Sequence, residues 1–498
     1  MARIAVIGAG MGAMAAAARL AVAGHRVTVY ERSETYGGSV GVFERDGFAF
    51  DTGPALLHLP AVWRDLFLKT GKEPLEKCVG LVQVDPASRH VFADGTEVTL
   101  PNASRAGIVS ALESALGAGA GERWGAFLGR AGDAWDRSRR PLLEEPLWSD
   151  WRVLERDPYP APRRRALLRT RTASTVAEVG AWELSDTRLA ALFEICVLGY
   201  GLDPRHSPAG AALLPYMEQT FGSWYVEGGL RELARAVYER CLARRVVFAF
   251  GCEVTAVVEK DGRAAGVELS GGAVVEADHV VAGMDAAPLT GQDLWREEDV
   301  RPRAGAGGEP LPGRFTVLLA LRGTGEADTA HRSVVHSPDT LAEAAAVFGG
   351  AVADRPTVTV LRPRDPRTRP DGGHEAVTLA ATVAGHGGRV DWTDEALRRR
   401  YTELLIDTAG GALGATETIR DRLVWHETLT PAETGSLSAP ALAGPDGRWL
   451  HPSNSTRLPG LYLVGGRSHP GGGLAHAGMS GALVAGLIVE GAGFRGSQ

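Results

Sequence analysis

Residues 4–31 read IAVIGAGMGAMAAAARLAVAGHRVTVYE, and this stretch decides the fold. The apolar run 4–7 predicts a strand, and the alanine-rich segment 13–23 predicts a helix. Residues 26–30 predict a second strand. A glycine-rich turn separates the first strand from the helix. The order of strand, glycine turn, helix and strand predicts one compact βαβ unit.

The glycine turn predicts a site for the pyrophosphate of a dinucleotide. Gly8 allows the tight turn, Gly10 lets the pyrophosphate approach the backbone, and Ala13 is small enough for close helix–strand packing. The N-terminus of the helix favours an anion there. Glu31 stands 21 residues beyond Gly10, where an acid accepts hydrogen bonds from ribose hydroxyls. Because an acid disfavours a 2′-phosphate, we expect FAD or NAD and not NADP.

Composition predicts an ordinary globular protein of two to three domains. The chain has 498 residues, of which 44% are hydrophobic and 23% charged. Its 53 basic and 60 acidic side chains give a net charge of −7, which does not suggest a nucleic-acid partner. The four cysteines are scattered without metal-ligand spacing, so we expect no metal site and a reducing compartment.

The most apolar stretch of the chain covers residues 474–489. Its 16 residues fall short of the roughly 20 that a membrane helix needs, so we expect a buried helix. The N-terminus opens directly on a strand and has no signal-peptide pattern. We therefore expect a cytoplasmic protein.

The residues after Glu31 favour FAD. Segment 36–39 reads YGGS and segment 48–54 reads FAFDTGP, and the two glycines let the chain run close along a cofactor. These segments resemble the phytoene (carotenoid) desaturase family within the flavin amine oxidase-like superfamily.

The C-terminal region is similar to the same family. Residues 458–466 read LPGLYLVGG and 469–473 read HPGGG, which is similar to the family's C-terminal flavin motif. Two further segments match, WYVEGGL at 224–230 and VVAGMDA at 280–286.

The glycine motif and the resemblance together predict a set of cofactor-binding residues. They are Gly8, Gly10, Met11, Gly12, Ala13, Glu31, Arg32, Gly37, Gly38, Ser39, Gly53, Pro54, Val254, Asp285, Gly465, Gly466, His469, Gly471, Gly472, Gly473 and Leu474. Ser39 departs from the family, which usually has an arginine there. Arg467 stands where many flavoproteins have an acid, and its charge could offset that loss.

Two histidines are candidates for catalysis, and three aromatic residues for the substrate pocket. His469 adjoins the flavin motif, and His58 follows the turn that begins at Gly53. The alternative for both is a structural histidine. Tyr200, Trp224 and Tyr225 are the pocket candidates, and the alternative for each is a place in the core.

The expected fold class is α/β, with two parts. One is an FAD-binding, Rossmann-like domain of the glutathione reductase type, built from discontinuous segments. The other is a substrate domain with a mixed sheet and a helical cap. We assign 1–100, 221–290 and 451–498 to the FAD-binding domain, 101–220 to the cap and 291–450 to the substrate sheet.

The resemblance implies an FAD-dependent desaturase of an apolar isoprenoid or polyene, in carotenoid biosynthesis or secondary metabolism. Hydride would pass from substrate carbon to flavin N5, and oxygen or a quinone would reoxidise the flavin. The arginine runs 137–140 and 163–165 in the expected cap leave room for peripheral contact with the inner face of a membrane.

Three alternatives remain open at this point. One is oxidation of a small cyclic or amine intermediate of a natural-product pathway. Another is the reverse reaction, catalysed by a saturase. The third is a prenyl-binding carrier without flavin, as in Rab GDP-dissociation inhibitors, and the intact run 469–473 argues against it. The sequence leaves the oligomeric state open.

Overall fold

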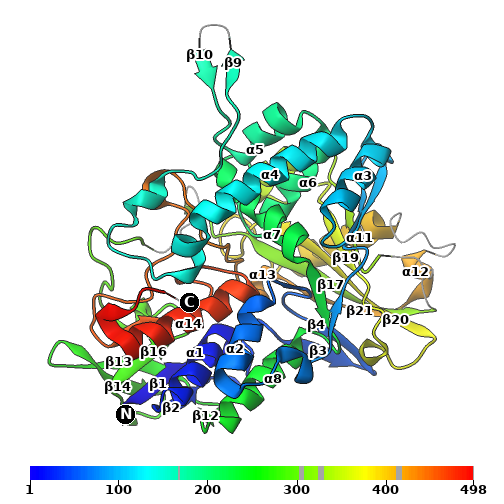
Figure 1. Cartoon of the computed structure of the whole chain (residues 1–498). Coiled ribbons are helices and arrows are strands. Elements are labelled where there is room, and N and C mark those ends of the chain that lie inside the picture. The colour runs from blue at the N-terminus through cyan, green and yellow to red at the C-terminus, as the bar shows by residue number, and fades with distance from the viewer. Residues whose placement is uncertain (167–168, 302–307, 324–329, 411–417, 497–498) are drawn as a thin grey trace.

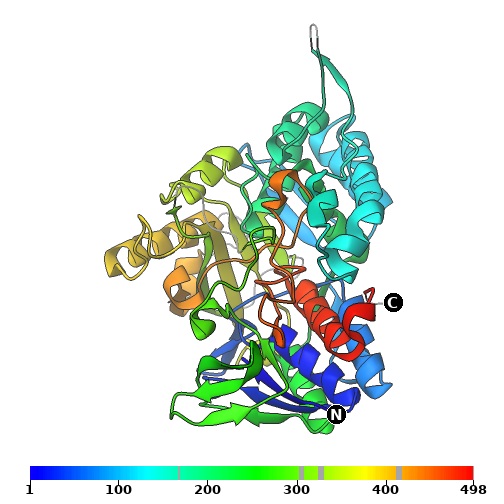
Figure 2. The same ribbon diagram turned by 90° about the vertical axis from the view of Figure 1, so that its left-hand side faces the viewer.

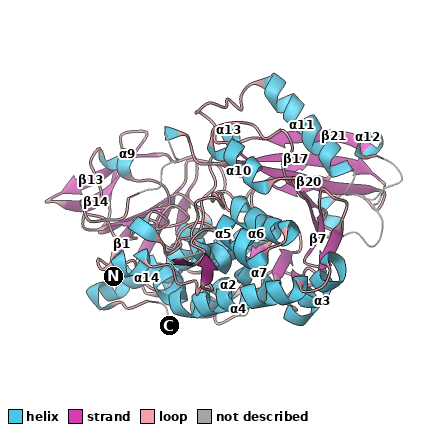
Figure 3. Cartoon of the chain, turned by 90° about the horizontal axis from the view of Figure 1, so that it is seen from above, coloured by secondary structure: helices cyan, strands magenta, loops and turns pink. Residues whose placement is uncertain are grey.

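The computed structural model describes residues 1–166, 169–301, 308–323, 330–410 and 418–496. Figure 1 shows a parallel sheet near the two termini, a larger sheet beside it, and a group of helices across one end of both. The view from above separates the two sheets clearly (Figure 3).

The parallel sheet is assembled from segments far apart in the sequence, as expected. Its hydrogen-bonded order is β12-β2-β1-β16-β22, and every pair is parallel. Its strands are β1 (Arg3–Ile7), β2 (Arg26–Tyr30), β12 (Val247–Ala249), β16 (His279–Ala282) and β22 (Leu461–Leu463). The helix between the first two strands is α1 (Met11–Val22), so the predicted βαβ unit is confirmed.

Successive side chains of a strand point to opposite faces of the sheet, so each strand of the parallel sheet contacts two different layers. Ile4 and Val6 pack against helices on one face, and Ala5 and Ile7 pack against a small antiparallel sheet on the other. The helices of this layer are α1, α2 (Ala61–Gly71), α8 (Leu230–Ala243) and α14 (Leu474–Glu490). The antiparallel sheet contains β13 (Val254–Lys260), β14 (Arg263–Leu269) and β15 (Val274–Glu276). This helix–sheet–sheet layering is the expected architecture of the FAD-binding domain.

The larger sheet has seven strands in the order β21-β17-β20-β19-β18-β7-β8. They are β7 (Ser88–Val91), β8 (Glu97–Leu100), β17 (Gly313–Arg322), β18 (Arg332–Val335), β19 (Val358–Leu361), β20 (His374–Val383) and β21 (Leu423–Leu429). Only β18 and β7 pair in parallel, so the sheet is mixed, as predicted. Helix α11 (Glu395–Gly410) packs its apolar side chains onto one face.

The sheet topology disagrees with one expected domain boundary, the one at residue 100. We assigned residues 1–100 to the FAD-binding domain, yet β7 and β8 are hydrogen-bonded into the seven-stranded sheet. The other domain boundaries stay predictions.

The helical layer comes from the region predicted to be the cap (Figure 2). It contains α3 (Arg105–Leu116), α4 (Ala120–Arg139), α5 (Val176–Val179), α6 (Thr187–Gly199) and α7 (Leu213–Phe221). Ser104 caps α3 by accepting a hydrogen bond from the Gly107 N–H, and Asp186 caps α6 in the same way. A hairpin of β9 (Arg164–Ala166) and β10 (Arg169–Arg171) projects from this layer (Figure 1).

Two small sheets lie between the parallel sheet, the seven-stranded sheet and the helical layer. Strand β11 (Ser223–Val226) pairs with β5 (Leu57–His58) on one side and β6 (Leu81–Gln83) on the other. A hairpin of β3 (Val42–Arg45) and β4 (Phe48–Asp51) packs two phenylalanines against the seven-stranded sheet. Helices that could cross a bilayer are absent from the described parts of the chain.

Candidate active site

The glycine turn leaves the first turn of α1 open to a ligand. Gly10 is the N-cap of α1 and has no side chain with which to cap it, and a Cβ added at Gly10 would meet no atom within 4 Å. Gly8 has a φ of 87°, a conformation that favours glycine. N–H groups at such a helix start bind phosphate well.

Glu31 is held beside this turn, at the carboxyl end of β2. Its Oε2 accepts a hydrogen bond of 2.7 Å from the Ala9 N–H, and its Oε1 accepts bonds of 2.9 and 2.8 Å from the N–H and hydroxyl of Ser33. These bonds orient the carboxylate next to the glycine turn, as ribose recognition requires. Arg32 follows as an exposed residue.

Two loops predicted to run along the cofactor pass close to each other. The first is residues 36–39, and the second is the end of segment 48–54. The Gly37 N–H donates to the Ala9 carbonyl at 2.8 Å, which fixes the first loop beside the glycine turn. A Cβ at Gly38 would lie 3.1 Å from the Gly10 Cα. A Cβ at Gly53 would lie only 2.0 Å from the carbonyl oxygen of Ser39, so the second loop passes there only because residue 53 is glycine. Pro54 is the next residue of this second loop.

Arg231 holds the first of these loops from α8. Its guanidinium donates to the carbonyls of Tyr36 and Val40 and to the hydroxyl of Thr35, and it stacks 4.0 Å from the Tyr36 ring centroid. A cation therefore lies next to Gly37, although the family's usual arginine is replaced by Ser39. Sequence reasoning missed Arg231 because it lies almost 200 positions from the loop.

The C-terminal turn is held by contacts from distant segments. A Cβ at Gly472 would lie 1.8 Å from the Ser438 carbonyl oxygen, so only glycine fits there. Gly471 and Gly473 have φ values of 96° and 101°. Gly473 is also the N-cap of α14, whose first residue is Leu474, and it makes no side-chain cap bond. A second uncapped helix start therefore adjoins the site.

The starts of α1 and α14 are brought together by close helix packing. A Cβ at Gly481 of α14 would lie 2.6 Å from the Gly12 carbonyl oxygen, and one at Gly12 would lie 3.0 Å from the Gly465 Cα. Gly12 therefore has a packing role beside its predicted cofactor role. Met11 and Ala13 are buried in the same layer.

His469 is fully buried at the base of the C-terminal turn. Its Nε2 donates to the Glu145 carbonyl at 2.9 Å, and the peptide bond to Pro470 is cis. Burial lowers the pKa of His469 to about 4, so the ring is neutral. This geometry ties the flavin motif to the helical layer and does not favour the catalytic role that we predicted for His469.

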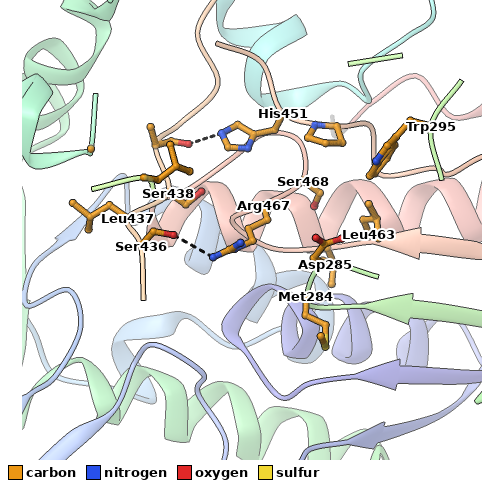
Figure 4. Close-up of a pocket in the computed structure, with 15 residues that line it drawn as sticks. Met284, Asp285, Trp295, Ser436, Leu437, Ser438, His451, Leu463, Arg467 and Ser468 are labelled. Atoms are coloured by element: carbon orange, nitrogen blue, oxygen red, sulfur yellow. Dashed lines mark hydrogen bonds between the residues drawn. The ribbon is translucent and has the colours of Figure 1, made fainter. Parts of the chain in front are cut away.

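A pocket of about 710 Å³ opens at the carboxyl ends of β16 and β22 (Figure 4). Asp285 lies at the end of β16 and accepts a hydrogen bond of 3.1 Å from the Ala287 N–H. Arg467 reaches across the pocket to the Ser436 hydroxyl at 3.3 Å. Gly465 has a φ of 100°, and a Cβ there would meet no atom within 4 Å, so its backbone is accessible. Gly466 adjoins it, and its carbonyl accepts a bond from the Ser438 hydroxyl.

Val254 lies away from this pocket. It begins β13 and packs between the antiparallel sheet and the parallel sheet, together with Tyr30. Its cofactor role stays a prediction.

A second pocket of about 640 Å³ lies between the glycine loops and the seven-stranded sheet. Gly53 and Ala55 line it from the cofactor side. Tyr225 lines it from β11, the central strand of the small sheet β5-β11-β6. Arg314 of β17 and His331 line it from the direction of the large sheet. Of the three predicted pocket aromatics, Tyr225 is thus a lining residue.

Asp51 lines the same pocket and supports α8. Its Oδ1 accepts a hydrogen bond of 2.9 Å from the Leu230 N–H at the first residue of α8. Burial raises the pKa of Asp51 to about 7, against the lowering effect of backbone hydrogen bonds from Leu230 and Arg231.

The other two predicted aromatics have different surroundings. Trp224 alternates with Tyr225 along β11, packs against the helical side of the parallel sheet, and donates from Nε1 to the Phe221 carbonyl. Tyr200 follows α6 and donates from its hydroxyl to Glu218 at 3.3 Å. Trp224 therefore belongs to a core layer, and Tyr200 belongs to a buried polar cluster.

This polar cluster joins the helical layer to both sheets and was not found by sequence reasoning. Glu218 of α7 forms an ion pair of 3.3 Å with Arg332 of β18, and the His58 Nε2 lies 4.0 Å from Glu218 Oε1. Burial alone would raise the pKa of Glu218, but its electrostatic interactions with His58 and Arg332 and its hydrogen bonds with Arg332 and Tyr200 hold it below its ordinary value. Burial lowers the pKa of His58.

The side chains of the cluster are not fully buried. The side chains of Glu218, Arg332 and His58 keep 18%, 23% and 23% of their accessible surface, although burial is the largest influence on the pKa of each. Arg314 connects them to the second pocket, because it lines that pocket and is electrostatically coupled to Arg332 and Tyr200.

The residues at the glycine turn and the two loops fit FAD. The backbone at Gly10 and Gly465 is open, two helix starts lack caps, and Glu31 is oriented for a ribose. Such a set of anion-binding backbone groups with one acid is what a dinucleotide needs.

Comparison with known proteins agrees with this geometry. The profile of the family "Flavin containing amine oxidoreductase" matches residues 14–489. The chain is 28% identical to 4,4'-diapolycopene oxygenase of Methylomonas sp, with 98% of each chain covered. It is 30% identical to all-trans-zeta-carotene desaturase of Myxococcus xanthus, with 94% of this chain and 90% of the other covered.

A solved structure shares the fold. An oxidoreductase from Methanosarcina mazei superposes with a TM-score of 0.63 at 16% identity, covering 97% of this chain and 99% of that one. The predicted fold class and cofactor are therefore confirmed. The chain belongs to the flavin-containing amine oxidoreductase family, among the phytoene and carotenoid desaturases, and is an FAD-dependent oxidoreductase.

Proposed function

We propose that the enzyme dehydrogenates a carbon–carbon single bond of an isoprenoid or polyene substrate in the second pocket. The observation that carries the proposal is that the loop residues Gly53 and Ala55 line this pocket together with Tyr225. A substrate there would lie against the loops predicted to follow the flavin. The names of the carotenoid-desaturating relatives support the substrate class.

The chain's own residues would orient the substrate and keep water out. When bound, FAD supplies a two-electron acceptor that takes hydride at N5 while a proton leaves the neighbouring substrate carbon. His58 is the residue that would take this proton, and its Nε2 lies 4.0 Å from the Glu218 Oε1. Oxygen or a quinone would then reoxidise the flavin.

Oxidation of a small amine is the alternative, and the charge of the cavity disfavours it. Arg314 lines the second pocket without forming an ion pair among the described residues, and the paired Arg332 lies close enough to lower the pKa of Arg314 further. A protonated amine would be repelled there, since like charges in a buried site are costly.

An anaerobic titration of the purified flavoprotein tests the reaction. We expect phytoene or another isoprenoid polyene to bleach the flavin absorption band, and a small cyclic amine to leave it unchanged. Bleaching by the amine alone would replace the desaturase with an amine oxidase. No bleaching by substrate, but oxidation of the chemically reduced flavin by a desaturated polyene, would indicate a saturase.

We also propose peripheral contact with an anionic membrane. The exposed residues Arg163, Arg164 and Arg171 lie on or beside the projecting hairpin β9–β10 (Figure 1). Clustered arginines bind anionic lipid surfaces, at about 1 kcal/mol each. We expect the protein to co-sediment with phosphatidylglycerol vesicles at low salt, and the triple glutamine variant to stay in the supernatant. Equal sedimentation of both proteins would exclude this hairpin as the contact.

A further inference from the structure

Arg314 is a half-buried cation in the lining of the second pocket, and no carboxylate among the described residues is paired with it. Among the described residues, no acidic side chain forms an ion pair with Arg314. Its hydrogen bond goes to the Gly199 carbonyl at 3.5 Å, which is long. By contrast, Arg332 is paired with Glu218 at 3.3 Å. Arg314 therefore brings to the pocket a positive charge that no ion pair among the described side chains balances.

A half-buried cation without an ion-pair partner is stabilised by an anionic ligand that accepts its hydrogen bonds. Burying a charge without a partner carries a large desolvation penalty. A hydrocarbon substrate could not offset that penalty, because it offers no acceptor. An arginine is suited to a carboxylate, which it binds with two parallel hydrogen bonds.

We propose that Arg314 binds a carboxylate at one end of the substrate, so that the enzyme acts on an isoprenoid or polyene acid. This inference rests on the proposed function and narrows its substrate class. Gly53 and Ala55 line the same pocket as Arg314, so the acid would anchor the chain beside the cofactor loops. Asp51 also lines the pocket, but its carboxylate is turned to the N-terminus of α8.

Binding of all-trans-retinoic acid and of its methyl ester tests the proposal. The two probes share one polyene chain, and only the acid is charged at neutral pH. With the FAD-loaded wild-type enzyme, we expect quenching of tryptophan fluorescence to give a Kd about tenfold lower for the acid, as expected for a charge-assisted hydrogen bond. We expect Arg314→Gln to bind both probes equally.

The matched control is Arg322→Gln, at the exposed end of the same strand β17. It should keep the preference for the acid. If Arg314→Gln does not fold, Arg314→Lys keeps the charge, loses the two-bond geometry and should show a reduced preference.

The outcomes separate this inference from the proposed function. Equal affinity of the wild-type enzyme for both probes would overturn the carboxylate site and leave the polyene pocket standing. Failure of both probes to bind, in enzyme that carries flavin, would overturn the polyene pocket and the inference with it. A preference that survives in Arg314→Gln would assign the acid to another residue.

Discussion

Replacement of Gly10 by valine should weaken FAD binding about 100-fold while the apoprotein stays folded. Gly10 has a φ of −71° and a ψ of 165°, which any residue adopts, and a Cβ there meets no protein atom within 4 Å. The new side chain would instead fill the space in front of the α1 N-terminus. Loss of two hydrogen bonds to a phosphate, each about 1.5 kcal/mol, raises the Kd about 100-fold.

The measurement has two arms, flavin content and apoprotein stability. We expect Gly10→Val to elute without the flavin absorption band, and its thermal midpoint to match that of wild-type apoprotein, because the N-cap change costs at most about 1 kcal/mol. Gly271→Val is the control, since Gly271 is exposed in a turn and a Cβ there also meets nothing. A Gly10→Val protein that keeps its flavin would remove the glycine turn from the cofactor site.

The FAD-binding part was largely predictable because its signals are local. The βαβ unit lies within residues 3–30, and its strand, turn and helix each have a clear pattern. The C-terminal run 469–473 was equally clear, and its glycines are explained by contacts such as that of Gly472 with Ser438. Glycine is visible in the sequence, whereas the atom that excludes a Cβ is not.

The substrate side could not be predicted because its contacts join distant segments. Glu218 and Arg332 are 114 positions apart, and neither belongs to a recognisable motif. The pairing of β7 with β18 joins residues 244 positions apart, such as Arg89 and Ser333, which explains why residues 88–100 were assigned to the wrong part. Arg314 looks like an ordinary strand residue until the fold turns its side chain into a pocket.

Removal of the Glu218 carboxylate should cost the protein more stability than any surface substitution. In Glu218→Ala, Arg332 loses its ion-pair partner, and its charge and that of the nearby Arg314 then lack an ion pair among the described residues. Breaking one side of a buried ion pair destabilises a protein by about 4 kcal/mol. We expect the thermal midpoint of the FAD-loaded enzyme to fall by several degrees, as calorimetry would measure.

Two control variants distinguish the cost of leaving a buried charge unpaired from the smaller cost of losing an ion pair. Glu239→Ala breaks an exposed pair with Arg235 and should cost about 0.5 kcal/mol or less, because solvent screens that pair. The double variant Glu218→Leu with Arg332→Leu removes both charges and should recover much of the loss, since apolar replacements of buried pairs are often neutral. If Glu218→Ala and Glu239→Ala lower the thermal midpoint equally, water solvates the charges of the Glu218–Arg332 cluster. The nearby Arg314 would then be solvated too and would not need a substrate carboxylate, so this comparison also tests the proposed substrate class.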